Sequence, residues 1–144
     1  MDTISSFKID HTTLMPGIYY SRRDKIGNEE VTTYDIRVTR PNVETVMTTT
    51  EAHTVEHLFA TYLRNFYRDI IYFGPMGCRT GFYLLTSGCP TLEDISERIK
   101  KACMWTLDYE GKVPGQSAVE CGNYKDLNLS DAKSIAKKIL SIIK

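Results

Sequence analysis

The chain has 144 residues, of which 42% are hydrophobic and 25% are charged, as expected for one globular domain. Its 18 basic and 18 acidic residues cancel to a formal charge of zero, so its charge gives no indication of a nucleic-acid or membrane surface. The N-terminal residues lack the basic and apolar regions of a signal peptide, and no apolar run approaches the roughly 18 residues of a membrane span. We therefore expect one domain over residues 1–144, located in the cytoplasm, with no nucleic-acid or membrane partner.

The N-terminal third of the chain carries the β-branched and aromatic alternation that is typical of strands. We expect strands around residues 5–9, 18–20 and 31–39. Pro16-Gly17 and Gly27-Asn28 separate these segments, because such dipeptides favour turns.

A helix is expected from residue 51 to about residue 67, because apolar side chains recur there at three- and four-residue spacing. Thr50 stands at the expected N-cap position. Two buried strands are expected next, around residues 70–73 and 81–86, with a turn rich in glycine and proline between them. The apolar face of the helix consists of Val55, Leu58, Phe59, Tyr62, Leu63 and Phe66.

Two further helices are expected, one over residues 91–107 and one that begins near Ser130. Strands therefore come first in the chain and helices later. This order favours an α+β fold, in which an antiparallel sheet packs against helices as a two-layer α/β sandwich.

His53, Glu56 and His57 form an H-x-x-E-H motif on the first expected helix. Residues four apart lie one above the other on a helix, so the two imidazoles can reach one metal ion. Glu56 is close enough to act as a base beside that metal. The chain has three histidines, and two of them stand at this ligand spacing, which favours metal binding over a chance pair of surface histidines.

The four cysteines have irregular spacing without a C-x-x-C pair, which argues against a zinc ribbon. Cys121 lies in a polar loop and is the best candidate for a third metal ligand. Cys78 lies in a turn rich in Gly and Pro, beside Arg79, where backbone N–H groups and a cation favour the thiolate. The alternative is a buried cysteine at a position that needs a small residue. Cys103 falls on an apolar helix stripe and is expected in the core, whereas Cys89 ends a strand and is expected to be structural or incidental.

Several segments together resemble one family, the LuxS family of S-ribosylhomocysteine lyases. The similarity covers nearly the whole chain, and it is specific because H-x-x-E-H is combined with P-M-G-C-R-T-G-F-Y and a later Cys-Gly. The segments that carry it, in chain order, are Ser6-Phe7 with Asp10-His11, then residues 35–37, 53–58, 74–83 and 120–122.

The resemblance implies a homodimer with active sites at the subunit interface. It also implies cleavage of S-ribosylhomocysteine to homocysteine and 4,5-dihydroxy-2,3-pentanedione, the precursor of a quorum-sensing autoinducer. Each subunit would hold one divalent metal, Fe²⁺, Zn²⁺ or Co²⁺. The family's residues map onto His53, His57 and Cys121 as metal ligands, Glu56 and Cys78 as the acid/base pair, and Ser6, His11, Arg37 and Arg64 as substrate contacts.

One position departs from the family pattern. Many members carry Asp six residues before the reactive cysteine, where it helps to bind the homocysteine end, and here Tyr72 stands at that position. A phenol can offer a neutral hydrogen bond, or its ring face to the substrate's ammonium group. We therefore include Tyr72 among the expected substrate contacts; the alternative is that Tyr72 is simply a strand residue and that water or another group meets the ammonium.

Two other functions fit parts of the pattern. Metallopeptidases with an inverted motif also use H-x-x-E-H, but they are much longer and take a carboxylate as third ligand. A non-catalytic module stabilised by metal would close the metal with four protein ligands. The identity of the third ligand and an open fourth position separate both alternatives from the lyase.

Overall fold

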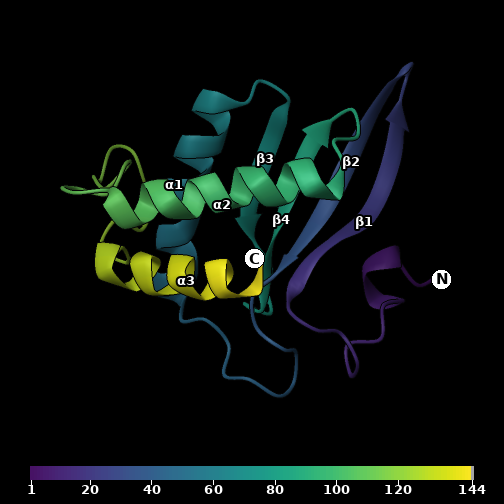
Figure 1. The fold of residues 1–144 in the computed structure, drawn as a ribbon, viewed down its shortest axis with the longest axis horizontal. Helices are drawn as coiled ribbons and strands as arrows, with labels where there is room; N and C mark the ends of the chain where they lie inside the picture. The colour runs from purple at the N-terminus through teal and green to yellow at the C-terminus, as the bar shows by residue number, and fades with distance from the viewer. Residues whose placement is uncertain (144) are drawn as a thin grey trace.

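The structure, a computed structural model that describes residues 1–143, has an α+β fold (Figure 1), which confirms the predicted class. Two of its strands precede the first α-helix, two follow it, and the other two α-helices come last. The elements in chain order are the 3-10 helix η1 (Ser5–Phe7), β1 (Gly17–Ile26), β2 (Glu29–Arg37), α1 (Thr49–Phe66), β3 (Ile70–Pro75), β4 (Gly81–Ser87), α2 (Leu92–Asp108) and α3 (Leu129–Ile142).

The four strands of residues 1–143 form one sheet in the order β1-β2-β4-β3, and every neighbouring pair is antiparallel. The helices lie on one face of this sheet, with α2 and α3 side by side and running in opposite directions (Figure 1). The fold is therefore a two-layer sandwich, as predicted. Within the described residues, no helix is both long enough and apolar enough to cross a membrane.

Helix α1 begins two residues before its predicted start, and its N-cap is Thr48 rather than Thr50. The Thr48 hydroxyl accepts a hydrogen bond from the Glu51 backbone N–H, and the Glu51 carboxylate accepts one from the Thr48 N–H. This reciprocal capping box satisfies two backbone donors that a helix start otherwise leaves free. The prediction of Thr50 was wrong because its hydroxyl instead donates to Asp126, in a loop far along the chain.

The expected strand over residues 5–9 is absent from the structure. Its first part is the 3-10 turn η1, in which the Lys8 N–H donates to the carbonyl of Ser5. Phe7 is 73% exposed, so the apolar alternation there does not reflect burial against the sheet. The segment lies beside β1 (Figure 1) and contributes to a cavity described below.

An aromatic stack joins α1 to the hairpin formed by β3 and β4. Phe73 lies between the other two rings, with centroids 5.4 Å from Phe59 on α1 and 4.9 Å from Phe82 on β4. All three side chains are almost fully buried. Offset rings at these distances add about 0.5–1.5 kcal/mol per pair beyond the burial of their area. Cys103 is also fully buried, which confirms its predicted place in the core.

The β3–β4 turn approaches β2 so closely that Gly81 has no room for a side chain. A Cβ built on Gly81 would lie 2.4 Å from the carbonyl oxygen of Ile36 and 3.0 Å from the Cα of Arg37. Just before it, Arg79 adopts a left-handed backbone with φ of 59°. The turn is thereby held tightly against the end of β2.

We expect Gly81→Ala to lower the free energy of unfolding by about 1–3 kcal/mol, because the new methyl group must push β2 and β4 apart. Gly77→Ala is the matched control in the same turn, since a Cβ there meets no atom within 4 Å. It should change stability by no more than about 0.5 kcal/mol. Urea unfolding measures both, and equal stability of the two variants would contradict the close approach.

Candidate active site

His53 and His57 stand one turn apart on α1, and the surrounding backbone fixes the direction of each ring. The Nδ1 atom of His53 lies 2.9 Å from the carbonyl oxygen of Asp126. The Nδ1 atom of His57 lies 2.8 Å from the carbonyl oxygen of Pro114. A carbonyl only accepts hydrogen bonds, so each Nδ1 carries a proton and donates. In the neutral rings, both Nε2 lone pairs are then free for a metal.

Cys121 completes a group of three ligand atoms. Its Sγ lies 3.5 Å from Nε2 of His53, and the backbone N–H of Asn123 donates to the same sulfur at 3.4 Å. An N–H donor at the sulfur stabilises the charged thiolate, which is the form that binds metals. One nitrogen or sulfur atom from each of His53, His57 and Cys121 lies within 4.8 Å of the others.

The three residues fit a tetrahedral metal ion with one open position. Metal bonds of 2.0–2.3 Å place tetrahedral ligand atoms about 3.3–3.8 Å apart. The spacing of 3.5 Å between Cys121 and His53 already lies in this range. The structure thus brings together the three ligands that the sequence predicts, in a group that can hold a metal ion.

The loop that leads to α3 (109–128) is held against α1 by polar contacts that sequence analysis did not find. The Thr50 hydroxyl donates to the Asp126 carboxylate, and the Asn128 N–H donates to the Thr54 hydroxyl at 2.9 Å. These contacts hold the Asp126 carbonyl in place against His53. No local pattern marks such residues, because their partners are distant in sequence.

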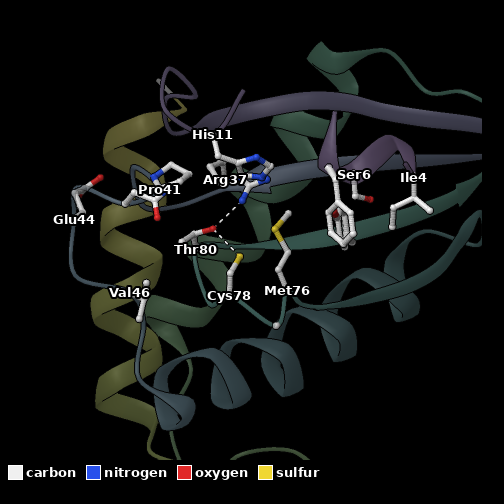
Figure 2. A pocket seen from close by; sticks show the side chains of 14 residues that line it. Ile4, Ser6, His11, Arg37, Pro41, Glu44, Val46, Met76, Cys78 and Thr80 are labelled. Carbon is white, nitrogen blue, oxygen red and sulfur yellow. Dashed lines mark hydrogen bonds between the residues drawn. The ribbon is translucent and has the colours of Figure 1, made fainter. Parts of the chain in front are cut away.

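A cavity of about 630 Å³ lies between the N-terminal segment, the end of β2 and the β3–β4 turn (Figure 2). Four of the predicted site residues line it: Ser6, His11, Arg37 and Cys78. The ring of His11 donates from Nδ1 to the carbonyl oxygen of Ile9 at 2.8 Å. The structure therefore gathers three of the five expected substrate contacts around the predicted reactive cysteine.

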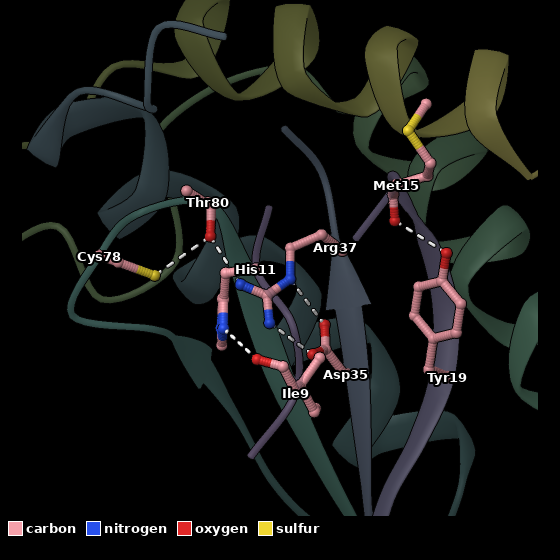
Figure 3. A network of polar contacts seen from close by, with 8 residues as sticks. All are labelled: Ile9, His11, Met15, Tyr19, Asp35, Arg37, Cys78 and Thr80. Atoms are coloured by element: carbon pink, nitrogen blue, oxygen red, sulfur yellow. Dashed lines mark hydrogen bonds and ion pairs between the residues drawn. The ribbon is translucent and has the colours of Figure 1, made fainter. Parts of the chain in front are cut away.

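Arg37 belongs to a buried polar network (Figure 3). Its Nε and Nη2 donate to the two carboxylate oxygens of Asp35, at 3.1 and 2.5 Å, and its Nη1 donates to the Thr80 hydroxyl at 2.7 Å. Burial raises the pKa of Asp35, while the hydrogen bonds and charge of Arg37 oppose that shift. Arg37 is only 3% exposed, so most of its hydrogen-bonding capacity serves the fold.

Comparison with known proteins gives the family of the chain. Residues 4–144 match the model of the S-ribosylhomocysteinase (LuxS) family. An S-ribosylhomocysteine lyase of Finegoldia magna is 56% identical over 99% of this chain and 92% of its own length. Lyases of the same name from Clostridium acetobutylicum and Phocaeicola vulgatus are each 49% identical, over 99% and 97% of this chain and 92% and 89% of their own lengths.

The chain belongs to the LuxS family. The resemblance predicted from the sequence motifs is thereby confirmed.

In this LuxS-family chain, Glu56 lies in a second depression, beside the metal ligands rather than beside Cys78. Glu56 and His53 line it together with Arg79, and it meets the larger cavity at Met76 and Gly77. The predicted acid/base pair is thus divided between two neighbouring hollows of one chain.

Tyr72 and Arg64 lie away from the larger cavity. Tyr72 is 47% exposed, and its phenol lies across Gly74. A Cβ built on Gly74 would lie 1.9 Å from the Tyr72 hydroxyl oxygen. Burial raises the pKa of Tyr72, and the charge of Glu56 raises it further. Arg64 lines a shallow depression on α1 with Thr61, and Thr61 also borders a depression that contains Glu56 and His57. The surface from the metal ligands to Arg64 is therefore a series of adjoining hollows.

We expect Gly115→Ala to weaken metal binding about 10–100-fold, because it disturbs the group that orients His57. Gly115 has φ of +77°, and a Cβ there would lie 2.9 Å from Nδ1 of His57. Gly111→Ala is the matched control: it also has a positive φ, of +97°, but a Cβ meets no atom within 4 Å. Competition with a chromophoric chelator measures both affinities, and an equal loss in the two variants would show that backbone strain alone is responsible.

Proposed function

We propose that this chain is an S-ribosylhomocysteine lyase, which converts its substrate to homocysteine and 4,5-dihydroxy-2,3-pentanedione. The observation that carries the proposal is the convergence of His53, His57 and Cys121, in which both Nδ1 atoms donate to backbone carbonyls and leave the Nε2 lone pairs for a metal. A chain 56% identical over nearly its full length carries that name. A thiol as third ligand also disfavours the metallopeptidase alternative.

The substrate explains why a metal and two proton carriers are needed. Its C–S bond is at C5 of a sugar, with no neighbouring carbonyl to acidify the adjacent proton. Two aldose–ketose shifts, from C1 to C2 and from C2 to C3, bring the carbonyl within reach of β-elimination. A divalent metal held by the three ligands supplies Lewis-acid stabilisation of the negative charge that develops on the sugar oxygens.

Cys78 and Glu56 are the proposed carriers of protons. Each carbonyl shift removes a proton from one carbon and returns one to its neighbour, and positioned acid/base groups accelerate such steps by about 10²–10⁴-fold. Cys78 is exposed in the larger cavity, and Glu56 lies beside the metal ligands. Ser6, His11 and Arg37 around Cys78 would bind the sugar, while Arg64 and Tyr72 on the metal side would bind the homocysteine end.

The division of these residues between two hollows supports a homodimer whose active sites lie at the interface. In this arrangement, Cys78 and its neighbours in one subunit face the metal and Glu56 of the other. The cavity has an apolar rim, including Ile4 and Phe7, which are 55% and 73% exposed. Exposed apolar side chains around a cavity are typical of a surface that a partner covers.

Zn²⁺, Fe²⁺ and Co²⁺ all suit two imidazoles and one thiolate, and availability decides which is bound in cells. We assign the enzyme to the cytoplasm, because a thiolate ligand and a thiol proton carrier need a reducing compartment. There it would serve autoinducer synthesis, removal of the methyl-cycle by-product, or both.

We expect the metal-loaded protein to release a free thiol from S-ribosylhomocysteine, and a chromogenic thiol reagent follows the reaction. Glu56→Gln and Cys78→Ala should each lower turnover by at least about 100-fold. Because neither residue is a proposed ligand, both variants should keep about one metal per chain, measured by elemental analysis. Cys121→Ala should lose the metal as well as the activity. Near-normal turnover in Cys78→Ala would exclude the proposed mechanism.

Mixed dimers test the shared site. When Glu56→Gln and Cys78→Ala subunits are mixed and reassociated, a mixed dimer should contain one intact site and one doubly damaged site. About a quarter of the wild-type activity should return if pairing is random. His11→Ala with Cys78→Ala is the matched control, since both residues line the same cavity and no site is restored. No recovery in the first mixture, with mixed dimers shown to form, would place each site within one subunit.

A further inference from the structure

The Thr80 hydroxyl links the buried ion pair to the candidate reactive thiol. Its Oγ1 lies 2.7 Å from Nη1 of Arg37 and 3.1 Å from Sγ of Cys78 (Figures 2 and 3). Thr80 is 4% exposed, while Cys78 faces the cavity. The hydroxyl therefore forms hydrogen bonds with both residues, and it is shielded from competing water.

The chemistry of Arg37 fixes the direction of the first hydrogen bond, and the charge state of Cys78 fixes the direction of the second. A guanidinium has donors and no acceptor, so Arg37 must donate to Oγ1 of Thr80. The hydroxyl keeps its own proton for another acceptor, and a thiolate at Cys78 is a charged acceptor at hydrogen-bond distance. Donation from a cation polarises a hydroxyl and strengthens the hydrogen bond that it gives in turn.

The backbone holds the Thr80 hydroxyl in this position. The carbonyl of Thr80 accepts hydrogen bonds from the N–H groups of Val38 and Thr39, at 2.9 and 3.0 Å. The next residue, Gly81, is pressed against β2. On the other side, Asp35 binds two nitrogens of Arg37 and leaves Nη1 directed at Thr80. The Thr80 hydroxyl is thus in place before any substrate binds, which is the condition for effective electrostatic stabilisation of a charge on Cys78.

We propose that Thr80 is a positioning residue, whose hydroxyl receives a hydrogen bond from Arg37 and donates one to Cys78, and so favours the reactive thiolate. The inference rests on the proposed role of Cys78 as a proton carrier. It assigns to Arg37 a task besides substrate contact: its charge acts on the sulfur through the threonine.

The rate of alkylation of Cys78 by iodoacetamide, measured over a range of pH, tests this directly and needs no turnover. Only the thiolate reacts, so the rate reports the fraction of thiolate. Cleavage after Arg68 and Arg79 gives a peptide in which Cys78 is the one cysteine, so mass spectrometry follows this thiol separately.

Other charged and titratable groups face the same region. His11, Glu44 and Tyr83 line the cavity, and Arg79 follows Cys78 in the chain. All of them are unchanged in variants of Thr80. A difference between two such variants therefore reports the hydroxyl itself.

Thr80→Val keeps the shape of the side chain and removes the hydroxyl. We expect it to slow alkylation about tenfold below neutral pH, to move the midpoint of the pH profile up by about one unit, and to leave the rate at high pH unchanged. Thr80→Ser keeps the hydroxyl and should follow the wild type. If Thr80→Val does not fold, Thr80→Ala takes its place with the same expected shift.

An unchanged midpoint in the variant without a hydroxyl would overturn the inference, and so would an equal shift in Thr80→Ser, since the methyl group would then be responsible. Turnover separates this inference from the proposed function. A shifted alkylation midpoint with full turnover would support the role of Thr80 and contradict that of Cys78. Metal content should stay equal in all variants, because Thr80 contacts no proposed ligand.

Discussion

The stack of Phe59, Phe73 and Phe82 is the contact on which the candidate site depends. It joins α1, which carries both histidines, to β3 and β4, whose turn carries Cys78. Most of the stability of a helix in a protein comes from the packing of its apolar face, so the packing of α1 on the sheet decides where its histidines stand. Protein interiors are close-packed, and a change in one of these rings would therefore move the helix and the turn relative to one another.

Buried polar groups give the cavity its chemistry. Burying the ion pair of Asp35 and Arg37 is costly, and such a pair contributes little to stability compared with apolar side chains of the same size. What the pair does provide is a fixed hydrogen-bond donor to Thr80, which in turn contacts Cys78. The low dielectric around these residues strengthens every hydrogen bond in the network. Burial in a low dielectric therefore has two effects on the ion pair: it lowers the contribution of the pair to stability, and it holds the hydrogen bonds of the pair in place.

The metal site depends on backbone conformation as much as on ligand type. Both histidine rings are oriented by carbonyl oxygens, those of Pro114 and Asp126, and every residue type has such an oxygen. What matters at these positions is the path of the loop, which Gly115 and the contacts of Asp126 with α1 maintain. This explains how a segment with little regular structure can orient metal ligands on a rigid helix.

The sequence by itself determined the features that depend on near neighbours in the chain. The spans of α1 and α2 follow from apolar periodicity, and the approach of His53 to His57 follows from helix geometry. The polar loop around Cys121 marked it as a candidate ligand, and the combination of motifs identified the family and supported that choice, although Cys121 is 68 residues from His53. The cap of α1 is also local, because Thr48 and Glu51 form the T-x-x-E pattern of a capping box. The tertiary structure alone decided that Thr50 contacts Asp126, that residues 5–7 form an exposed turn rather than a strand, and that Arg37 contacts Thr80. In each of these three cases the deciding interaction, or the lack of burial, depends on which distant segments meet, and local propensities contain no information about that.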